Sequence, residues 1–290
     1  MTYGYICTNY RNARFTVAAV ESLFTNDVQP SHIVVVDNDP ASADSVALQA
    51  LAVRHPTVEI ISTEANVGYF AGLNIGIARL RELNSTIDWL VIGNNDLEFP
   101  QEFGATLEQV MPELAHLPVI SPNIVTLDGL PQNPHVVRGV SRGRELVYDL
   151  YYANYHLARL IRAVARRTQR VTDRHDEAGH EQAQFIYQGH GAAYILTRRF
   201  FELLDALWAP TFLLGEEFFL SRQLAQVGER VYYEPRIKVH HHCNGAIGAL
   251  PSRTMWQLAR DAHRVYRQYI KPWHKQDGSS LPPTSLKHVE

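Results

Sequence analysis

Short apolar runs alternate with helical stripes over the first 117 residues, and each run ends in polar side chains. Runs of this length are typical of strands buried in a sheet, whereas apolar residues that recur every three or four positions indicate amphipathic helices. The runs cover 3–7, 33–36, 58–61 and 89–92. This β-α-β-α-β-α-β order predicts an α/β fold with a mainly parallel central sheet, right-handed crossovers and flanking helices.

The clearest stripe follows the third run. Residues 66–74 lead into a helix whose expected buried face carries Phe70, Leu73, Ile77 and Leu80. These four positions recur at intervals of three and four, as one face of a helix does.

The fourth run stops at a glycine, and Asn94, Asn95 and Asp96 follow at once. In an open α/β sheet, ligands bind just beyond the carboxyl ends of the strands. Oxygen donors of this kind suit a hard divalent ion such as Mg²⁺ or Mn²⁺. An asparagine-rich turn would explain the same residues without a ligand, so this interpretation needs support from the rest of the chain.

The pattern changes after residue 117. Strands are expected at 119–125, where Pro122 indicates an edge or a bulge, at 192–197, and in two pieces at 231–235 and 237–239. Glu216 and Glu217 open a helix that Gly228 ends.

We expect one domain over residues 1–273. It would divide into halves at 1–117 and 118–250, with a variable helical insert at 133–184 and a C-terminal helix at 251–273. The polar stretch 274–290 is expected to be a tail.

Residues 157–167 combine an apolar face with an arginine-rich one. The apolar face carries Leu157, Leu160, Ile161 and Val164. The simpler interpretation is a surface helix docked on the core. The alternative is a helix that lies on an anionic membrane leaflet, where each Lys or Arg adds about 1 kcal/mol. The arginines concerned are Arg159, Arg162, Arg166 and Arg167.

Composition narrows the functional classes. The chain has 290 residues with 27 Lys+Arg against 30 Asp+Glu, a balance that argues against nucleic acid as a partner. No apolar run is long enough to span a membrane, and the N-terminus does not read as a secretion signal. Two cysteines, Cys7 and Cys243, without paired spacing suggest a reducing compartment. We therefore expect a cytoplasmic protein.

Common nucleotide-binding fingerprints are absent. No G-x-G-x-x-G follows the first strand, the Gly68 and Gly72 pair has the wrong spacing, and no P-loop occurs. These absences disfavour a NAD enzyme and an NTPase.

Three polar clusters lie at the ends of predicted elements: residues 94–96, 216–217 and 240–242. Glutamates at a helix start often only complement its dipole, for about 0.3–1 kcal/mol each. Three consecutive histidines could form a solvated turn. A zinc site is disfavoured because it needs about four N or S ligands and only Cys243 is close in sequence.

In this order, the clusters and strand ends resemble motifs of the inverting family-2 glycosyltransferases with the GT-A fold. The similarity is to the bacterial rhamnosyltransferase-like branch of O-antigen and capsule synthesis, and it runs from about Tyr3 to about His242. The matching segments are 9–10, 35–38, 66–74, 94–96, 214–220 and 238–241.

The resemblance implies a nucleotide-sugar donor linked to dTDP, UDP or GDP. The residues implied in binding it are Thr8, Asn9, Tyr10, Asp37, Asn66, Gly68, Asn74, Asn94, Asn95 and Asp96. It also implies Mg²⁺ or Mn²⁺ held by Asp96 and His241, with His240 and His242 as alternatives to His241.

By the same resemblance, Glu217 is the catalytic base of a hexosyl or deoxyhexosyl transfer, and Glu216 supports the site or holds the acceptor. The sequence departs from the family motifs at two positions. Asn94 replaces the first Asp of the D-x-D motif, and Glu217 replaces an Asp. His190 and Trp208 are further candidate acceptor contacts, although packing explains each of them as simply.

The implied acceptor is a glycan or a lipid-linked glycan at the inner membrane face, which would give the basic helix a use in peripheral membrane contact. Two alternatives stay open. One is a catalytically inactive GT-A protein that binds nucleotide or glycan. The other is a sugar nucleotidyltransferase, which would need a glycine-rich loop after the first strand, and residues 8–14 contain no glycine.

Overall fold

A computed structural model of the chain describes residues 2–42, 44–168, 179–243 and 252–270. The elements of this part are, in chain order, β1 (Tyr3–Asn9), α1 (Ala13–Phe24), β2 (His32–Asp37), α2 (Asp44–Arg54), β3 (Val58–Ser62), α3 (Tyr69–Leu83), β4 (Trp89–Asn94), β5 (Leu97–Glu98), α4 (Phe103–Leu114), β6 (Val119–Thr126), α5 (Arg142–Ala153), α6 (Tyr155–Thr168), β7 (Gln184–Ile186), β8 (Ala193–Thr197), α7 (Arg198–Leu203), α8 (Glu216–Gln226), β9 (Val231–His241) and α9 (Ser252–Tyr269).

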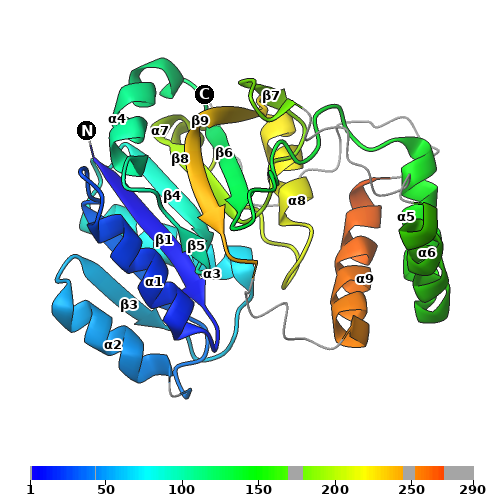
Figure 1. Cartoon of the computed structure of the whole chain (residues 1–290), viewed down its shortest axis with the longest axis horizontal. Coiled ribbons are helices and arrows are strands. Elements are labelled where there is room, and N and C mark those ends of the chain that lie inside the picture. The colour runs from blue at the N-terminus through cyan, green and yellow to red at the C-terminus, as the bar shows by residue number, and fades with distance from the viewer. Residues whose placement is uncertain (1, 43, 169–178, 244–251, 271–290) are drawn as a thin grey trace.

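One sheet runs through both halves of the chain (Figure 1). Its strand order is β3-β2-β1-β4-β8-β6-β9-β5, and β7 pairs with β9. The strands β3, β2, β1 and β4 are parallel, as the pattern predicts. In this parallel part, Asn9 stands beside Asp37 and Thr8 beside Asn94. The polar strand ends therefore meet at one edge of the sheet.

The α/β class and the helix-flanked sheet are confirmed, but the sheet as a whole is mixed rather than mainly parallel. Strand β8 runs antiparallel to both β4 and β6, and β5 and β7 run antiparallel to β9. An apolar run shows that a strand is buried but carries no information on its direction. The parallel half could be inferred because a helix stands between its successive strands.

Two apolar cores cover the two faces of the sheet. Alternate residues of β1 point to opposite sides, so Tyr5 joins one core and Ile6 the other. Helices α1, α2 and α4 cover the first face, and α3, α7 and α8 cover the second. The predicted apolar face of α3 is buried at all four positions.

At two prolines, the structure decides what the sequence pattern left open or predicted wrongly. Strand β6 has a register shift between Pro122 and Asn123, so the predicted irregularity is a bulge inside the sheet and not an edge. Strand β9 continues through Pro235 as one strand, although the pattern predicted two pieces. The pairing of β9 with β6 skips from Glu234 to Lys238, so Pro235 falls in the skipped stretch and need not donate to that ladder.

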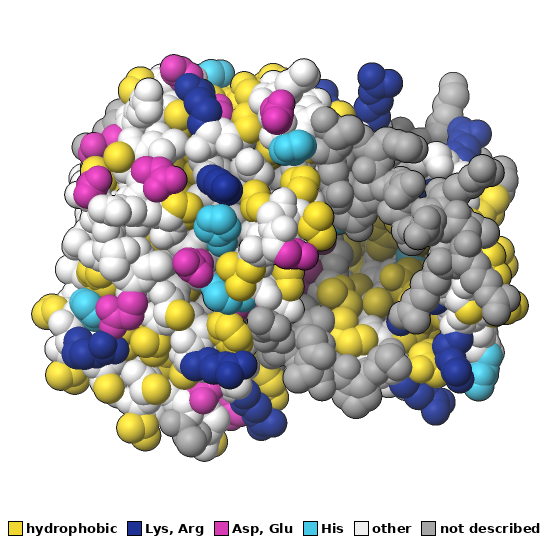
Figure 2. All heavy atoms as spheres, viewed as in Figure 1, with side chains coloured by type: hydrophobic (Ala, Val, Ile, Leu, Met, Phe, Trp, Pro, Cys, Tyr) yellow, Lys and Arg dark blue, Asp and Glu magenta, His cyan; other side chains and the backbone are white. Residues whose placement is uncertain are grey.

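Helices α5, α6 and α9 stand beside the sheet body (Figure 1). Helix α9 packs on the rest through Val265, Tyr266 and Tyr269, which contact the apolar cluster of Trp208, Phe218, Phe219 and Ile270. Helix α5 packs on α9, where Trp256 donates from Nε1 to the Tyr151 carbonyl at 3.0 Å. In the space-filling view, Lys and Arg side chains occur both over the sheet body and on the side of these helices (Figure 2).

The stripe of α6 is only partly covered. Leu157 and Ile161 are half-buried, whereas Leu160 is 60% exposed and Val164 51% exposed. Arg159 and Arg162 are exposed as well. The side chains at 166–167, and the whole of the predicted tail 274–290, lie outside the described residues. Within the described ranges, no helix combines the length and apolar character needed to cross a membrane.

Candidate active site

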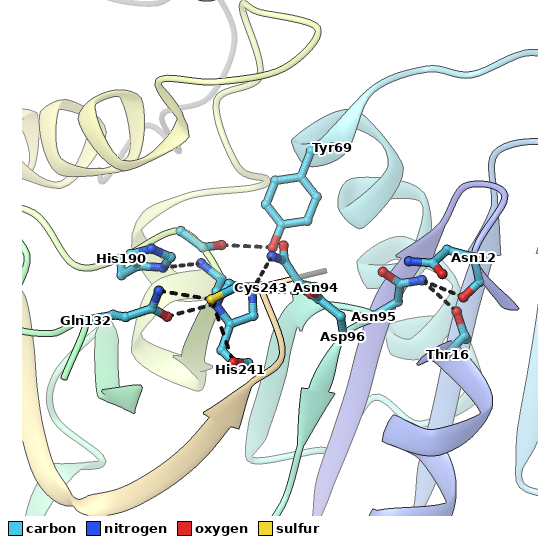
Figure 3. Close-up of polar contacts among 12 residues, drawn as sticks. Asn12, Thr16, Tyr69, Asn94, Asn95, Asp96, Gln132, His190, His241 and Cys243 are labelled. Atoms are coloured by element: carbon cyan, nitrogen blue, oxygen red, sulfur yellow. Dashed lines mark hydrogen bonds and ion pairs between the residues drawn. The ribbon is translucent and has the colours of Figure 1, made fainter. Parts of the chain in front are cut away.

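A cavity of about 620 Å³ opens where the ends of β1, β2 and β4 meet the segment before α8 and one side of α9. Asp96 from the front half and Glu217 from the back half both line it. Figure 3 shows polar contacts among residues in and beside this lining. The described lining residues are Thr8, Tyr10, Asn38, Asn66, Gly68, Tyr69, Asn94, Asn95, Asp96, His190, Gly191, Ala192, Phe212, Leu213, Leu214, Glu216, Glu217, His241, Cys243, Thr254 and Leu258.

Most of the candidate site residues come together here. Those outside the lining are Asn9, Asp37, Asn74 and Trp208, together with His240 and His242, the alternatives to His241. Asn38, Tyr69, Cys243 and the residues from α9 line the cavity although the sequence analysis assigned them no role. Asn38 and Tyr69 could have been found from the sequence, since they directly follow the candidate donor-binding residues Asp37 and Gly68.

Asn9 and Asp37 form a buried network behind the cavity. The Asn9 amide donates to Asp37 Oδ1 at 3.1 Å and accepts from the Thr16 hydroxyl at 2.8 Å. The Asn95 amide donates to Thr16 Oγ1 at 2.8 Å. Because these side chains bond to one another, the three strand-end segments hold a fixed position relative to one another.

Asp96 and His241 face each other at the cavity, with Asp96 Oδ1 3.3 Å from His241 Nε2. On its other side, His241 Nδ1 lies 2.7 Å from Oε1 of Gln132. A carbonyl oxygen only accepts, so Nδ1 carries a proton. Nε2 lies 3.3 Å from the Asn94 amide nitrogen, which only donates, so Nε2 accepts there with its lone pair. The Gln132 amide nitrogen donates to Cys243 Sγ at 3.4 Å, which fixes this orientation of the amide.

The donor set fits a hard divalent ion. Two neighbouring ligands of one octahedral ion, each at about 2.1 Å, lie about 3.0 Å apart, and the Asp96–His241 separation of 3.3 Å is close to this. Gln132 supplies the outer contact that ligating histidines commonly have. No three His, Cys, Asp or Glu side chains of the described ranges form a ready metal cluster. A bound ligand would therefore have to supply further oxygens.

The register of β9 separates the three consecutive histidines. His241 lines the cavity, whereas His242 contacts Glu98 at 3.0 Å. His240 pairs with Glu98 and Val125 across the sheet. Of the three, His241 is the one placed beside Asp96.

Glu216 and Glu217 begin α8, as predicted, but their environments differ. Glu216 is buried, and its Oε1 accepts from the Leu214 amide at 2.9 Å. Burial and the neighbouring charge of Glu217 raise the pKa of Glu216 to about 8. Glu217 is only partly buried, and its Oε1 accepts from the Gly191 amide at 3.2 Å. Glu217 is thus the more accessible carboxylate of the pair.

Tyr69 joins the two sides of the cavity. Its hydroxyl donates to the Gly191 carbonyl at 2.9 Å. Burial raises its pKa well above the usual value, and the charges of Glu216, Glu217 and Asp96 act in the same direction. All three carboxylates are therefore close enough to act on one buried hydroxyl.

Residues 66–74 hold the segment that leads into α8. The Asn74 side chain donates to the Leu207 carbonyl at 2.8 Å and accepts from the Leu207 amide at 2.9 Å, as a paired backbone would. The Tyr69 amide donates to the Phe212 carbonyl at 3.1 Å. Gly68 has φ of 93°, and an added Cβ would lie 2.1 Å from that carbonyl oxygen. Only glycine allows this approach.

His190 lies at the cavity and Trp208 does not. The His190 ring is 5.7 Å from that of His241, and its Nδ1 accepts from the Ala192 amide at 3.2 Å. Trp208 is buried between Phe219 and Tyr269, with ring centroids at 5.1 and 4.7 Å. Its described contacts hold α9 against α8.

Comparison with known proteins identifies the fold. Neither a protein-family model nor a curated protein matches this sequence. Solved structures do match, at low sequence identity. GalNAc-T7 with UDP, GalNAc and Mn²⁺ superimposes with a TM-score of 0.51 at 14% identity, over 83% of this chain and 44% of that one. The mannosyltransferase PcManGT of Pyrobaculum calidifontis, with GDP-Man and Mn²⁺, gives 0.53 at 16%, over 91% and 64%.

Residues 1–349 of S. aureus TarS with UDP-GlcNAc give a TM-score of 0.55 at 12% identity, over 89% of this chain and 64% of that one. The chain thus spans about half to two thirds of the length of these three structures. The similarity confirms the GT-A fold expected from the motifs. The rhamnosyltransferase-like branch of family 2 stays a prediction.

Replacing Gly68 with Ala should destabilise the protein by at least twice as much as replacing Gly129. Both glycines have positive φ, but a Cβ at Gly129 meets nothing within 4 Å, whereas at Gly68 it meets the Phe212 carbonyl. Positive φ alone costs an L-residue about 1–2 kcal/mol. Urea unfolding of both variants measures the difference, and equal costs would contradict the proposed contact.

Stability should fall as the pH rises from about 5 to 8, and Glu216→Gln should flatten this decline. With its pKa raised to about 8, the folded Glu216 keeps a proton that the unfolded chain has released, so raising the pH favours unfolding. Thermal unfolding at several pH values measures the effect. Glu102→Gln, at an exposed position, serves as the control and should leave the pH profile unchanged; a similar flattening there would contradict the assignment.

Proposed function

We propose that the protein is an inverting glycosyltransferase that moves a hexosyl or deoxyhexosyl group from a nucleoside-diphosphate sugar to an acceptor hydroxyl. The observation that carries the proposal is that Asp96 and Glu217 line one cavity. Asp96 follows β4 in the half that we expect to bind the nucleotide sugar. Glu217 lies in the first turn of α8, in the half that we expect to bind the acceptor.

The donor diphosphate needs a cation in this cavity. Asp96, Glu216 and Glu217 line it, and no Lys or Arg occurs among its described lining residues. A diphosphate would be repelled by the ionised carboxylates among these three unless a positive charge stood between them. Asp96 and His241 are the residues that would hold Mg²⁺ or Mn²⁺, which when bound stabilises the charge of a departing diphosphate as a Lewis acid. Mn²⁺ is present in the structures of GalNAc-T7 and PcManGT named above.

We assign the donor to the strand-end side of the cavity. Thr8, Tyr10, Asn38 and Asn66 supply hydroxyl and amide groups there. Asn9 and Asp37 act on the donor indirectly, because their side chains bond within the buried network. The neighbouring structures contain UDP, GDP-Man and UDP-GlcNAc, and the motif resemblance adds dTDP-linked sugars.

We assign Glu217 as the base that takes the proton of the acceptor hydroxyl. Its carboxylate is the accessible one, and the Gly191 amide holds it in place. Glu216 keeps a proton through much of the neutral range because its pKa is raised to about 8. Burial thus favours a proton on Glu216, which leaves Glu217 as the carboxylate that we assign to proton transfer. A single attack in line with the departing diphosphate inverts the anomeric carbon.

The acceptor would enter between His190, the segment 212–214 and α9, where Thr254 and Leu258 line the cavity. A glycan or lipid-linked glycan of a bacterial surface polysaccharide, as in the rhamnosyltransferase-like branch of family 2, is the acceptor that the motif resemblance suggests.

Asp96→Ala should remove the effect of metal on donor binding. We expect the wild-type protein to bind its nucleoside diphosphate at least tenfold more tightly with Mn²⁺ or Mg²⁺ than with EDTA, since the cation offsets the carboxylates. Calorimetry with UDP, GDP and dTDP measures this. Asp39→Ala, outside the lining, should retain the metal effect; an Asp96→Ala variant that keeps it too would refute the metal assignment.

Glu217→Gln should bind donor as the wild-type protein does and transfer sugar about 10²–10⁴-fold more slowly. The amide is close in size to the carboxylate but cannot take a proton. Single-turnover transfer to an acceptor panel, read by mass spectrometry, measures this. Near-normal transfer by Glu217→Gln would exclude it as the base. Pyrophosphate release from a sugar phosphate and a nucleoside triphosphate would instead indicate a nucleotidyltransferase.

A further inference from the structure

The helical hairpin made by α5 and α6 leaves large apolar side chains in solvent. Leu150 on α5 is 55% exposed, and Leu160 and Val164 on α6 are 60% and 51% exposed. Leu146 and Val147 on α5 are exposed as well. Single exposed apolar residues are common, but five on two adjacent short helices indicate a surface that contacts something apolar.

The orientation of α5 places this apolar surface away from the rest of the protein. Glu145 and Asp149 face α9, where Arg267 lies 2.8 Å from Glu145 and 2.6 Å from Asp149. At 100° per residue, Leu146 and Leu150 lie on another side of the helix. The apolar residues are therefore not part of the contact that fixes the hairpin.

The charge around these residues is positive. The exposed ionised side chains of the described hairpin include Arg142, Arg144, Arg159 and Arg162. Both described carboxylates of the hairpin are engaged with α9: Glu145 is buried, and Asp149 contacts His263 and Arg267. Exposed apolar side chains and exposed arginines on the same two helices match a membrane with anionic lipids, in which acyl chains lie beneath negative headgroups.

Tyrosines accompany the arginines. The Arg162 guanidinium lies 5.5 Å from the centre of the Tyr151 ring and donates to its hydroxyl at 2.7 Å. Arg144 lies 6.0 Å from the centre of the Tyr148 ring. Tyrosine is common at the boundary between headgroups and acyl chains because its ring is apolar and its hydroxyl polar.

A second copy of the chain is a poorer occupant. A two-fold dimer through this surface would bring two positively charged surfaces against one another. Nucleic acid would match the arginines but not the apolar side chains. We therefore propose that the α5–α6 hairpin is a membrane-docking surface that binds anionic bilayers by inserting Leu150, Leu160 and Val164 while Arg159 and Arg162 contact the headgroups.

The test is sedimentation of the full chain with vesicles. We expect binding to phosphatidylcholine vesicles that contain about a third phosphatidylglycerol, weak binding to pure phosphatidylcholine, and loss of binding near 0.5 M salt. Arg159→Glu with Arg162→Glu should weaken binding by about 25-fold or more, since each arginine near the surface contributes roughly fivefold. Leu150→Gln with Leu160→Gln should weaken it at least tenfold.

Matched controls change the same residue types elsewhere. Arg54→Glu with Arg230→Glu makes the same change in net charge at exposed positions. Val46→Gln with Val53→Gln removes apolar side chains that are 75% and 83% exposed on α2. Both controls should bind vesicles as the wild-type protein does. Since all substituted side chains are exposed, unfolding temperatures should stay within a few degrees.

Three results would overturn the proposal: no binding to anionic vesicles, equal losses in hairpin and control variants, or a wild-type dimer that Leu150→Gln with Leu160→Gln dissociates. The proposal does not depend on the catalytic assignment. Nucleoside diphosphate binding by the hairpin variants, measured in the same preparations, separates the two. A chain that binds vesicles but no nucleotide would keep the docking surface and lose the proposed activity.

Discussion

The arrangement of the cavity depends on one contact, between the start of α3 and the segment that precedes α8. Asn74 pairs with the backbone of Leu207, and Gly68 lets the Tyr69 amide reach the Phe212 carbonyl. The segment 207–214 is therefore held from the front half, although it belongs to the back half. Since Glu216 and Glu217 follow directly, this contact sets the position of both glutamates relative to Asp96. The packing of Leu220 and Leu224 in the core holds α8 against the sheet, and this contact adds a hold on the backbone that leads into it.

Because this contact brings Glu216 and Glu217 close to Asp96, their negative charges repel one another. Three carboxylates line a cavity with no cationic side chain in its described lining. A proton relieves the repulsion between Glu216 and Glu217, because burial raises the pKa of Glu216 to about 8. At the other end, Asp96 Oδ1 faces the lone pair of His241 Nε2. A cation placed between these two acceptors would be attracted by both. The protonated Glu216 thus lies beside the proposed base, Glu217. The proposed cation site, at Asp96 and His241, lies where we place the diphosphate.

Much of this structure could be predicted from local sequence patterns, and the rest depends on contacts between residues far apart in the sequence. The buried face of α3 and the polar ends of β1, β2 and β4 follow from periodicity and from sheet geometry, both of which are local. The direction of β8, the continuity of β9 through Pro235 and the burial of Trp208 depend on partners more than twenty residues away. Asn74 shows the difference most clearly. Its place in the motif was visible in the sequence, but its partner Leu207 was not, because a side-chain amide that imitates a backbone pair leaves no periodic signal.

Helix α9 links the cavity to the exposed hairpin. One side of α9 contributes Thr254 and Leu258 to the cavity lining, and another side binds α5 through Arg267 and Tyr266, both of which contact Glu145. Glu145 is buried and Arg267 is mostly so. Removing either member of such a pair leaves a poorly solvated charge, so the pair resists separation. The hairpin therefore keeps a fixed position relative to the cavity wall formed by α9. If the hairpin lies on a bilayer, that wall has a defined height above the membrane, and an acceptor anchored in the same bilayer meets the cavity from one direction.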